Sequence, residues 1–315
     1  MARRSMPAGT LPTLKNVVFL VGPTASGKSR IAAEVAARCD AEIVSADAYQ
    51  IYRGLSILTA QPNEATLNKA PHHLIGVAPL TAEMNADKFR QLALSAIEDI
   101  HRRGKLALVV GGSGLYVKAL THGLAPLPEV DRTLRSELSL LSLEELESRL
   151  MAVDPLSAET IDRRNKRRLV RALEIFAQTK RPASEQRREW KEQASYTRGV
   201  FVLRDRAELN ARIDRRVEET FRDGVTEEVA AAREVSATAA KALGFFEVRQ
   251  LLENRMTQPE CIAAIQQKTR RYAKRQLTWF RRQLSFEELN LSRLKDHHAA
   301  ADWILQKVLL LRPSE

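Results

Sequence analysis

The chain has 315 residues, of which 44% are hydrophobic; this predicts about two domains with a sizeable core. No apolar run approaches the ~20 residues of a membrane span, so we expect no membrane-spanning helix. The net charge of +11 is concentrated in residues 162–191, with 11 Lys or Arg against 4 Asp or Glu, and in residues 268–282, with 7 basic residues and no acidic one; such segments are typical of polyanion binding, although solvated helix faces would also produce them.

The first predicted elements are a strand, a glycine-rich turn, a helix and a second strand. Residues 1–16 contain two arginines but no apolar stretch, so we expect a disordered tail rather than a secretory signal, with a transit peptide as the alternative. Val17–Val21 is a short apolar run, and Ser26–Arg38 has the Ala-rich character of a helix. Glu42–Ser45 is a second apolar run, and it ends at Ala46-Asp47.

The alternation of strands and helices continues to about residue 122, and helical patterns without a strand follow it. Apolar residues at 3- and 4-residue spacing predict a helix from Asp87 to Arg103. Leu106–Val110 is another buried strand, and it stops at Gly111-Gly112. From about Gly123 to Ser195 the patterns are helical, with a capping box at Ser142 and Glu145, before Val200–Leu203 returns to a strand.

These elements predict an α/β fold in which a parallel sheet is flanked by helices. We expect one core domain formed by residues 17–122 and 199–315, with mostly helical C-terminal residues, and an all-helical insertion domain at residues 123–198. The two cysteines, Cys39 and Cys261, lie far apart without metal-ligand spacing, which favours a reducing, cytoplasmic compartment.

Residues 22–29 satisfy the phosphate-loop pattern G-x-x-x-x-G-K-[ST], directly after an apolar strand and before a helix. Backbone N–H groups of such a loop converge on phosphate oxygens at a helix N-terminus. Lys28 would neutralise phosphate charge and the Ser29 hydroxyl would hold Mg²⁺; the alternative is a tight turn with an idle lysine. The predicted phosphate-binding residues are Gly22, Thr24, Ala25, Ser26, Gly27, Lys28 and Ser29.

The loop alone does not decide whose phosphates it binds. No Asp ends the Leu106–Val110 strand, as a magnesium-side partner for a nucleotide would; Gly-Gly-Ser follows instead. Asp47 is the strand-end carboxylate, and parallel topology places it at the carboxyl edge of the sheet, as it does the loop. From the residues alone, Asp47 could serve Mg²⁺, as in many kinases, or act on an acceptor.

An ordered series of motifs over residues 17–283 resembles the tRNA dimethylallyltransferases. The motifs are GPTASGKS (22–29), SADAYQIYRG (45–54), TAQP (59–62), PHHLI (71–75), VGGSGLYVKAL (110–120), GLAPLP (123–128), RRLVRALEIF (167–176), RIDRR (212–216), ALGFFE (242–247) and KRQLTWFR (274–281). The resemblance implies transfer of a dimethylallyl group from dimethylallyl diphosphate to N6 of the adenine 3′ of the anticodon in tRNA. The phosphate loop would then hold the pyrophosphate of the donor and not ATP.

The resemblance also implies the catalytic residues, namely Asp47, Lys28, Ser113 and Arg216. Asp47 would be the general base for the weakly nucleophilic amine, with a helix N-cap or an indirect Mg²⁺ contact as alternatives. Lys28, Mg²⁺ at Ser29 and Arg216 would stabilise the departing pyrophosphate, with Arg212 as the alternative arginine. Ser113 stands where the family commonly has Thr; it would bond the pyrophosphate or the amine, or stabilise a turn.

Partners follow from the same resemblance: the tRNA anticodon stem-loop and dimethylallyl diphosphate, with Mg²⁺ as cofactor, no membrane, and a monomeric protein. The target base must be extruded into the protein, so tRNA is expected across a cleft between core and insertion. Trp279 and Phe280 are expected to pack rather than stack on bases, and His72 and His73 not to share an ion. The implied tRNA-binding residues are Asp47, Ala48, Tyr49, Gln50, Ser113, Arg135, Arg167, Arg168, Arg171, Lys241, Phe245, Lys274, Arg275 and Arg281.

The chain departs from the family pattern on the acceptor side. Ala48 replaces the usual Ser, Leu58 and Gln61 replace Gly and Lys, Gly76 replaces a common Asp, and Phe245 replaces a common Tyr. These departures put tRNA positioning and rate in doubt more than the chemistry. Two alternatives stay open: a P-loop kinase for a small molecule, and a tRNA-binding relative that has lost catalysis.

Overall fold

The computed structural model of the protein describes residues 14, 16–124, 128, 131–186 and 198–309. The predicted tail lies outside the described residues except for Leu14 and Asn16. The chain divides into two compact units, which we name the core unit (Leu14–Leu120 with Thr197–Glu315) and the helical unit (within Thr121–Tyr196). Among the helices that the structure describes, none has both the length and the apolar character that crossing a bilayer requires.

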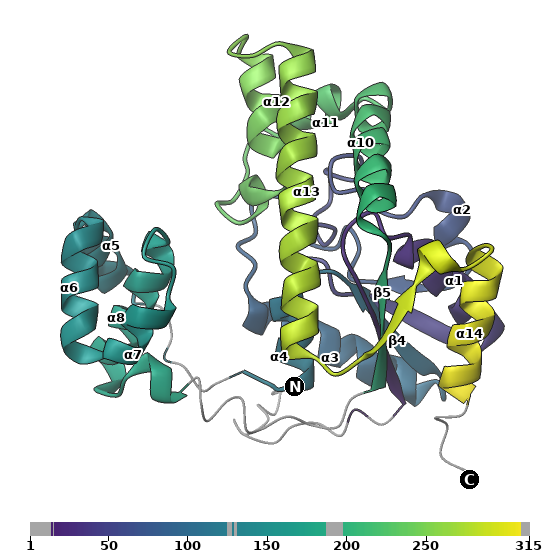
Figure 1. Cartoon of the computed structure of the whole chain (residues 1–315), viewed down its shortest axis with the longest axis horizontal. Helices are drawn as coiled ribbons and strands as arrows, with labels where there is room; N and C mark the ends of the chain where they lie inside the picture. Colours follow the sequence, from purple (N-terminus) through teal and green to yellow (C-terminus); the bar gives the residue numbers. More distant parts are fainter. Residues whose placement is uncertain (1–13, 15, 125–127, 129–130, 187–197, 310–315) are drawn as a thin grey trace, which may run out of the picture. The chain divides into compact units, whose positions relative to one another are not determined.

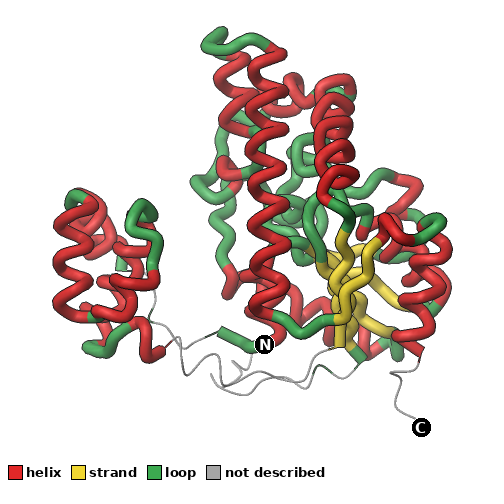
Figure 2. The backbone as a smooth tube through the Cα atoms, in the orientation of Figure 1, coloured by secondary structure: helices red, strands yellow, loops and turns green. Residues whose placement is uncertain are grey.

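The core unit is built on a six-stranded parallel sheet with the strand order β3-β2-β4-β1-β5-β6 (Figures 1 and 2). The strands are β1 (Val17–Val21), β2 (Ala41–Ser45), β3 (His72–His73), β4 (Leu106–Gly111), β5 (Arg198–Leu203) and β6 (Glu287–Asn290). Residues of β1, β2 and β4 are buried throughout, as the apolar runs of a parallel sheet covered on both faces require. The predicted α/β class is confirmed, and because every pair is parallel, all carboxyl ends lie at one edge.

Helices cover both faces of this sheet. On one face, α1 (Lys28–Arg38) and α14 (His297–Leu309) bury apolar residues such as Ile31 and Ile304 against the strands. On the other face, α3 (Ala86–Arg102), α4 (Gly114–Thr121) and the end of α13 (Gln258–Gln283) contribute Phe89, Val117 and Phe280. Phe280 is buried and Trp279 packs partly buried beside it, as expected for packing residues.

A group of helices projects beyond the carboxyl edge of the sheet. It consists of α10 (Arg206–Arg222), α11 (Val225–Ala231), α12 (Phe245–Leu252) and α13, and Figure 1 shows α10, α12 and α13 side by side. Val217, Val229, Phe245, Val248 and Ile265 form part of the apolar cluster that joins these helices. The short helices α2 (Glu64–Leu67), η1 (Ala239–Lys241) and η2 (Leu291–Arg293) complete the core unit.

The described part of the helical unit contains the helices α5 to α8, a further helical segment at residues 183–186 and no strand, in agreement with the helical patterns of its sequence. The labelled helices are α5 (Arg132–Leu140), α6 (Leu143–Val153), α7 (Pro155–Thr160) and α8 (Lys166–Thr179). Leu146, Leu150 and Leu169 are completely buried among them. The predicted capping box is confirmed: the Glu145 carboxylate accepts the Ser142 N–H at 2.8 Å, and the Ser142 hydroxyl accepts the Glu145 N–H at 3.1 Å.

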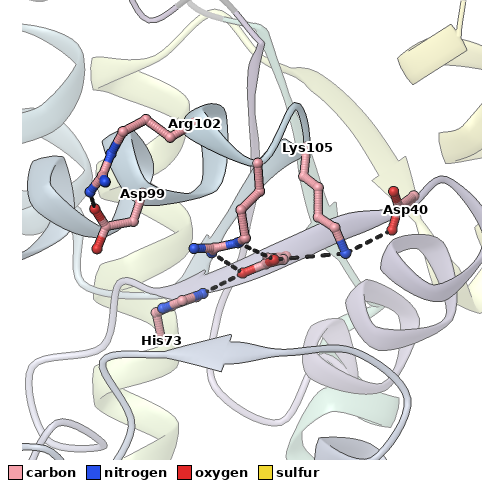
Figure 3. A network of polar contacts seen from close by, with 7 residues as sticks. Asp40, His73, Asp99, Arg102 and Lys105 are labelled. Atoms are coloured by element: carbon pink, nitrogen blue, oxygen red, sulfur yellow. Dashed lines mark hydrogen bonds and ion pairs between the residues drawn. The ribbon is translucent and has the colours of Figure 1, made fainter.

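A polar network surrounds the buried Glu42 near the amino end of β2, away from the carboxyl edge (Figure 3). Arg103 donates to both carboxylate oxygens, at 3.0 and 2.7 Å, and His73 Nε2 lies 2.7 Å from Oε2. Lys105 bridges Glu42 and Asp40. The hydrogen bond from Arg103 lowers the pKa of Glu42, and the contact with His73 acts in the same direction. Burial acts in the opposite direction but is outweighed. His72 instead contacts the Ala70 carbonyl, so the two histidines have different partners.

We expect Glu42→Gln to lower the free energy of unfolding by about 2 kcal/mol at pH 7, because charge-assisted hydrogen bonds to Arg103 are lost. A carboxylate whose pKa is lowered by folding contributes stability above its unfolded pKa, and this contribution disappears as the pH falls through its folded pKa. The difference between the two proteins should therefore shrink in urea titrations below about pH 4. Asp302→Asn, which breaks the exposed pair with Arg38, is the control and should cost under about 0.5 kcal/mol; equal costs would contradict the account.

Candidate active site

The phosphate loop joins β1 to α1 at the carboxyl edge of the sheet. Gly22 is required there, because a Cβ at this position would lie 2.3 Å from the Val202 carbonyl oxygen, and Gly27 has φ 95°. Two arginines hold the loop from its carbonyl side: Arg204 Nε donates to Ser26 O at 2.8 Å and Arg212 Nε to Ala25 O at 2.9 Å. Fixing these carbonyls also fixes the peptide planes and thus the directions of the N–H groups.

Thr24 is held by two further side chains. Arg216 Nη2 donates to the Thr24 hydroxyl at 2.7 Å, and the buried Gln276 accepts the Thr24 N–H at 2.9 Å. Gln276 Nε2 also donates to the Gly112 carbonyl at 2.8 Å, so one amide ties the phosphate loop to the turn after β4. Both the N–H and the hydroxyl of Thr24 are therefore engaged by side chains of the protein, and the Ser26 N–H bonds the Pro23 carbonyl at 3.3 Å.

Asp47 lies in a tight turn directly after β2. Its Oδ1 accepts the N–H groups of Tyr49 at 3.0 Å and of Gln50 at 3.4 Å. The Ser113 hydroxyl accepts the Ala48 N–H at 2.9 Å, so the predicted pair Asp47 and Ser113 belongs to one turn system. Gly111 permits this approach, since a Cβ there would lie 2.1 Å from the Ala46 carbonyl oxygen.

Three charged groups meet beside the loop. Burial lowers the pKa of Lys28 to about 8; the charge of Asp47 opposes this shift and the charge of Arg216 adds to it. Burial also lowers the pKa of Arg216, and the charge of Asp47 again opposes this shift. Lys28 Nζ rests 3.3 Å from the Pro23 carbonyl. Two cations and one carboxylate leave an excess positive charge, which an anionic ligand would neutralise.

A pocket of about 670 Å³, measured out to its open mouth, begins at this charged group. Thr24, Asp47 and Arg216 line its polar part, and Tyr272 of α13 is a further polar wall residue. Burial raises the pKa of Tyr272, with the charge of Asp47 adding to the shift. The remaining wall is largely apolar and includes Leu58, Val217, Phe221, Val225, Leu243 and Ile265. The pocket thus has a polar end that suits an anion and a largely apolar wall that suits a hydrocarbon group.

The segment that carries Leu58 is anchored by Glu228 of α11. The Glu228 carboxylate accepts the N–H groups of Ile57 at 2.9 Å and Leu58 at 2.8 Å, and the Ser56 hydroxyl at 3.0 Å. Gln61, which replaces the family's usual Lys, donates to the carbonyls of Gln50 and Tyr52, both at 2.9 Å. The Gln61 side chain is therefore held by backbone carbonyls of the neighbouring turn.

The predicted tRNA-binding residues of the core unit fall into two groups. Lys241, Lys274, Arg275 and Arg281 are exposed, and Arg281 pairs with Glu288 at 3.0 Å. Gln50 supports the pocket wall through the Ala60 carbonyl at 2.8 Å. Phe245 is 6% exposed and packs in the core of the projecting helices, and its contact with tRNA stays a prediction.

In the helical unit, Arg167 and Arg168 are exposed at the start of α8. Arg135 and Arg171 converge on the buried carboxylate of Glu174, at 2.5 and 2.9 Å. Glu174 therefore fixes the guanidinium groups of two predicted tRNA-binding residues, while both arginines keep part of their surface in solvent.

Sequence reasoning did not single out Arg204, Glu228, Tyr272 or Gln276. Gln276 lies inside the KRQLTWFR motif, and Tyr272 lies two residues before it. The motif could therefore have pointed to both residues as candidates for the site. Nothing in the sequence points to Arg204 or Glu228, because their contacts depend on how α10 and α11 pack against distant loops.

The charge of Lys28 predicts how the binding of a phosphate ligand depends on pH. A diphosphate bound at the loop would stabilise the ammonium form, so the Kd for inorganic diphosphate should be steady below about pH 8 and rise by up to about tenfold per pH unit above it. Isothermal titration calorimetry at fixed Mg²⁺ from pH 7 to 9.5 measures this slope. Lys28→Arg keeps its charge throughout that range and should show a flat profile; parallel profiles would contradict the assignment to Lys28.

A parallel sheet with this loop at its carboxyl edge and a cationic pocket beside it defines a P-loop α/β protein. A model of the family described as IPP transferase matches residues 50–283. The chain belongs to this family, which confirms the resemblance seen in the motifs.

Known relatives match nearly the whole chain. A tRNA dimethylallyltransferase of Akkermansia muciniphila is 40% identical over 291 residues, which cover 92% of this chain and 99% of the relative. A tRNA dimethylallyltransferase 1 of Citrifermentans bemidjiense is 44% identical over 84% of this chain and 88% of the relative. The crystal structure of a tRNA isopentenylpyrophosphate transferase from Staphylococcus epidermidis aligns with TM-score 0.68 at 30% identity, covering 93% and 98% of the two chains.

A eukaryotic dimethylallyltransferase acting on tRNA aligns with TM-score 0.79 over 96% of this chain and 81% of that chain. At 24% identity this likeness shows the shared fold.

Proposed function

We propose that the protein is an enzyme that transfers a dimethylallyl group from dimethylallyl diphosphate to N6 of the adenine 3′ of the anticodon in tRNA, forming N6-isopentenyladenosine and releasing diphosphate. The observation that carries this proposal is the pocket: its polar end lies at the phosphate loop, Arg216 and Asp47, and its wall continues with apolar side chains. Such a site matches a diphosphate that carries a short hydrocarbon chain.

The leaving group accounts for the two cations. As the bond between allyl carbon 1 and oxygen breaks, positive charge grows on carbon and negative charge grows on the diphosphate. In this proposal Lys28, Arg216 and N–H groups of the loop would stabilise that negative charge, and groups fixed in advance need no reorganisation during the reaction.

Asp47 is the proposed acceptor of the proton that N6 loses when the new carbon–nitrogen bond forms. The two N–H donors on Oδ1 fix the side chain, and among the described residues no hydrogen bond is made to Oδ2. Lys28 and Arg216 both interact electrostatically with Asp47, so the base would lie beside the departing diphosphate. Ser113 would hold the turn that carries Asp47 and Ala48, and contact the amine or the diphosphate.

The site fits Mg²⁺ as a companion of the diphosphate. Within the described residues, no three His, Cys, Asp or Glu side chains gather into a metal centre of protein ligands alone. Mg²⁺ commonly binds through one or two protein oxygens, substrate phosphates and water, and Ser29 and Asp47 offer such oxygens. Ser29 is the proposed ligand, and the ion would supply additional charge neutralisation on the leaving diphosphate.

A small-molecule kinase is less well supported, because β4 ends at Gly111 and continues with Gly112 and Ser113 rather than with a metal-binding carboxylate. A relative without catalysis is also less well supported, because Lys28, Asp47 and Arg216 are all present and in electrostatic contact. We further propose that the enzyme acts as a monomer in the cytoplasm; its two cysteines, Cys39 and Cys261, lie far apart in the chain and lack metal-ligand spacing.

The test is a product assay. Purified protein, Mg²⁺ and unmodified tRNA are incubated with dimethylallyl diphosphate or, separately, with ATP, and the nucleosides are analysed by mass spectrometry. The proposal predicts an adenosine heavier by one dimethylallyl group with the diphosphate donor alone. An unmodified tRNA that nevertheless binds would support the non-catalytic relative, and ATP hydrolysis would support the kinase.

A further inference from the structure

A row of cations runs along α13 beside the pocket. Ile265, Thr269 and Tyr272 line the pocket from one face of this helix. Lys268, Arg271 and Arg275, which recur at 3- and 4-residue spacing on the neighbouring face, are exposed; we name them the α13 cation row. Residues 268–282 contain no acidic side chain; within the row, Lys268 pairs with Glu247 of α12.

An exposed aromatic ring lies at the same place. Phe246, in the first turn of α12, is 61% exposed, whereas its neighbour Phe245 is buried. Lys268 Nζ lies 5.5 Å from the centroid of the Phe246 ring, and the buried Glu247 pairs with the same ammonium group. The ring is therefore next to the first cation of the row, and it stands only three residues after the pocket residue Leu243.

We propose that Phe246 is a stacking site for an unpaired base of the RNA substrate, adjacent to the base that enters the pocket, while the α13 cation row contacts the flanking phosphates. This inference rests on the proposed function. Extruding one base of a loop leaves its neighbours without a stacking partner, and an exposed aromatic ring can replace that partner. An aromatic platform next to a cationic track is the combination used to bind single-stranded nucleic acid, and it matches both the apolar ring and the charge around it.

The experiment uses the full-length protein and an anticodon stem-loop RNA, with Kd measured at fixed salt. Phe246→Ala should weaken binding by roughly 5- to 100-fold, Phe246→Trp should restore it to within a few-fold, and Phe246→Leu should not. The KM for dimethylallyl diphosphate and the urea unfolding midpoint should stay unchanged in all three variants. Leu92→Ala, which removes an exposed apolar side chain on α3, is the control and should bind like the parent.

A set of RNAs that each carry one abasic nucleotide in the loop identifies the stacked base. The Phe246→Ala penalty should disappear for the RNA that lacks the stacked base and persist for the others. Arg271→Ala should instead weaken binding to every RNA and reduce the salt slope by about one. A penalty that is equal for all RNAs, or rescue by Leu as complete as rescue by Trp, would overturn the stacking role. Absence of prenylated product from the parent enzyme would overturn the proposed function and leave this binding result standing.

Discussion

Asp47→Asn is expected to lower the rate of prenyl transfer by about 10²- to 10⁴-fold, the usual contribution of a positioned general base. Asparagine keeps the Oδ1 acceptor that binds the N–H groups of Tyr49 and Gln50, so the turn survives while the capacity to take a proton is lost. Single-turnover rates at saturating tRNA and donor measure the chemical step. The Kd for tRNA should remain within a few-fold of the parent value.

Asp47→Ala is the matched comparison, because it removes both the base and the acceptor of the two N–H groups. It should be as slow as Asp47→Asn in the chemical step and, in addition, bind tRNA less well, since the turn over residues 47–50 is loosened. A rate for Asp47→Asn close to that of the parent would show that Asp47 supports the turn and does not act as the base.

Arg216→Gln is expected to lower kcat by about 10²- to 10³-fold, the cost of removing one preorganised donor to a developing anion. Arg216 lines the pocket and donates to the Thr24 hydroxyl, so it lies where the diphosphate is expected. The measurement is kcat and the KM for dimethylallyl diphosphate, with the tRNA Kd as a check that RNA binding is intact.

Arg212→Gln distinguishes the two arginines of the RIDRR motif. Arg212 binds the Ala25 carbonyl, and it does not line the pocket. Its loss should loosen the loop and raise the donor KM, with a smaller effect on kcat. If Arg212→Gln lowered kcat more than Arg216→Gln, the roles of the two arginines would have to be exchanged.

The sequence predicts the central part of the fold because the strands of a parallel sheet are buried on both faces and appear as apolar runs. β1, β2, β4 and β5 follow this rule. The edge strands β3 and β6 do not: β3 consists of two half-buried histidines, and two of the four residues of β6 are exposed. Edge strands pack on fewer neighbours, so they carry no apolar pattern and were missed.

The candidate site is predictable where a role follows from a motif. The electrostatic contact among Lys28, Asp47 and Arg216 unites a loop, a strand end and a helix that lie far apart in the chain. The roles of Arg204 and Glu228 arise only from tertiary packing and have no local signal. Phe245 and Phe246 show the limit most clearly, because successive residues of a helix point about 100° apart and one is buried while the other is exposed.

The most direct test of the central claim is a crystal structure of the protein with Mg²⁺ and an unreactive thio-analogue of dimethylallyl diphosphate. The account predicts the diphosphate in the loop of residues 22–29, within reach of Lys28 and Arg216, and the hydrocarbon chain in the pocket that Asp47 lines. A diphosphate bound elsewhere, for example along the α13 cation row, with the loop empty, would contradict it.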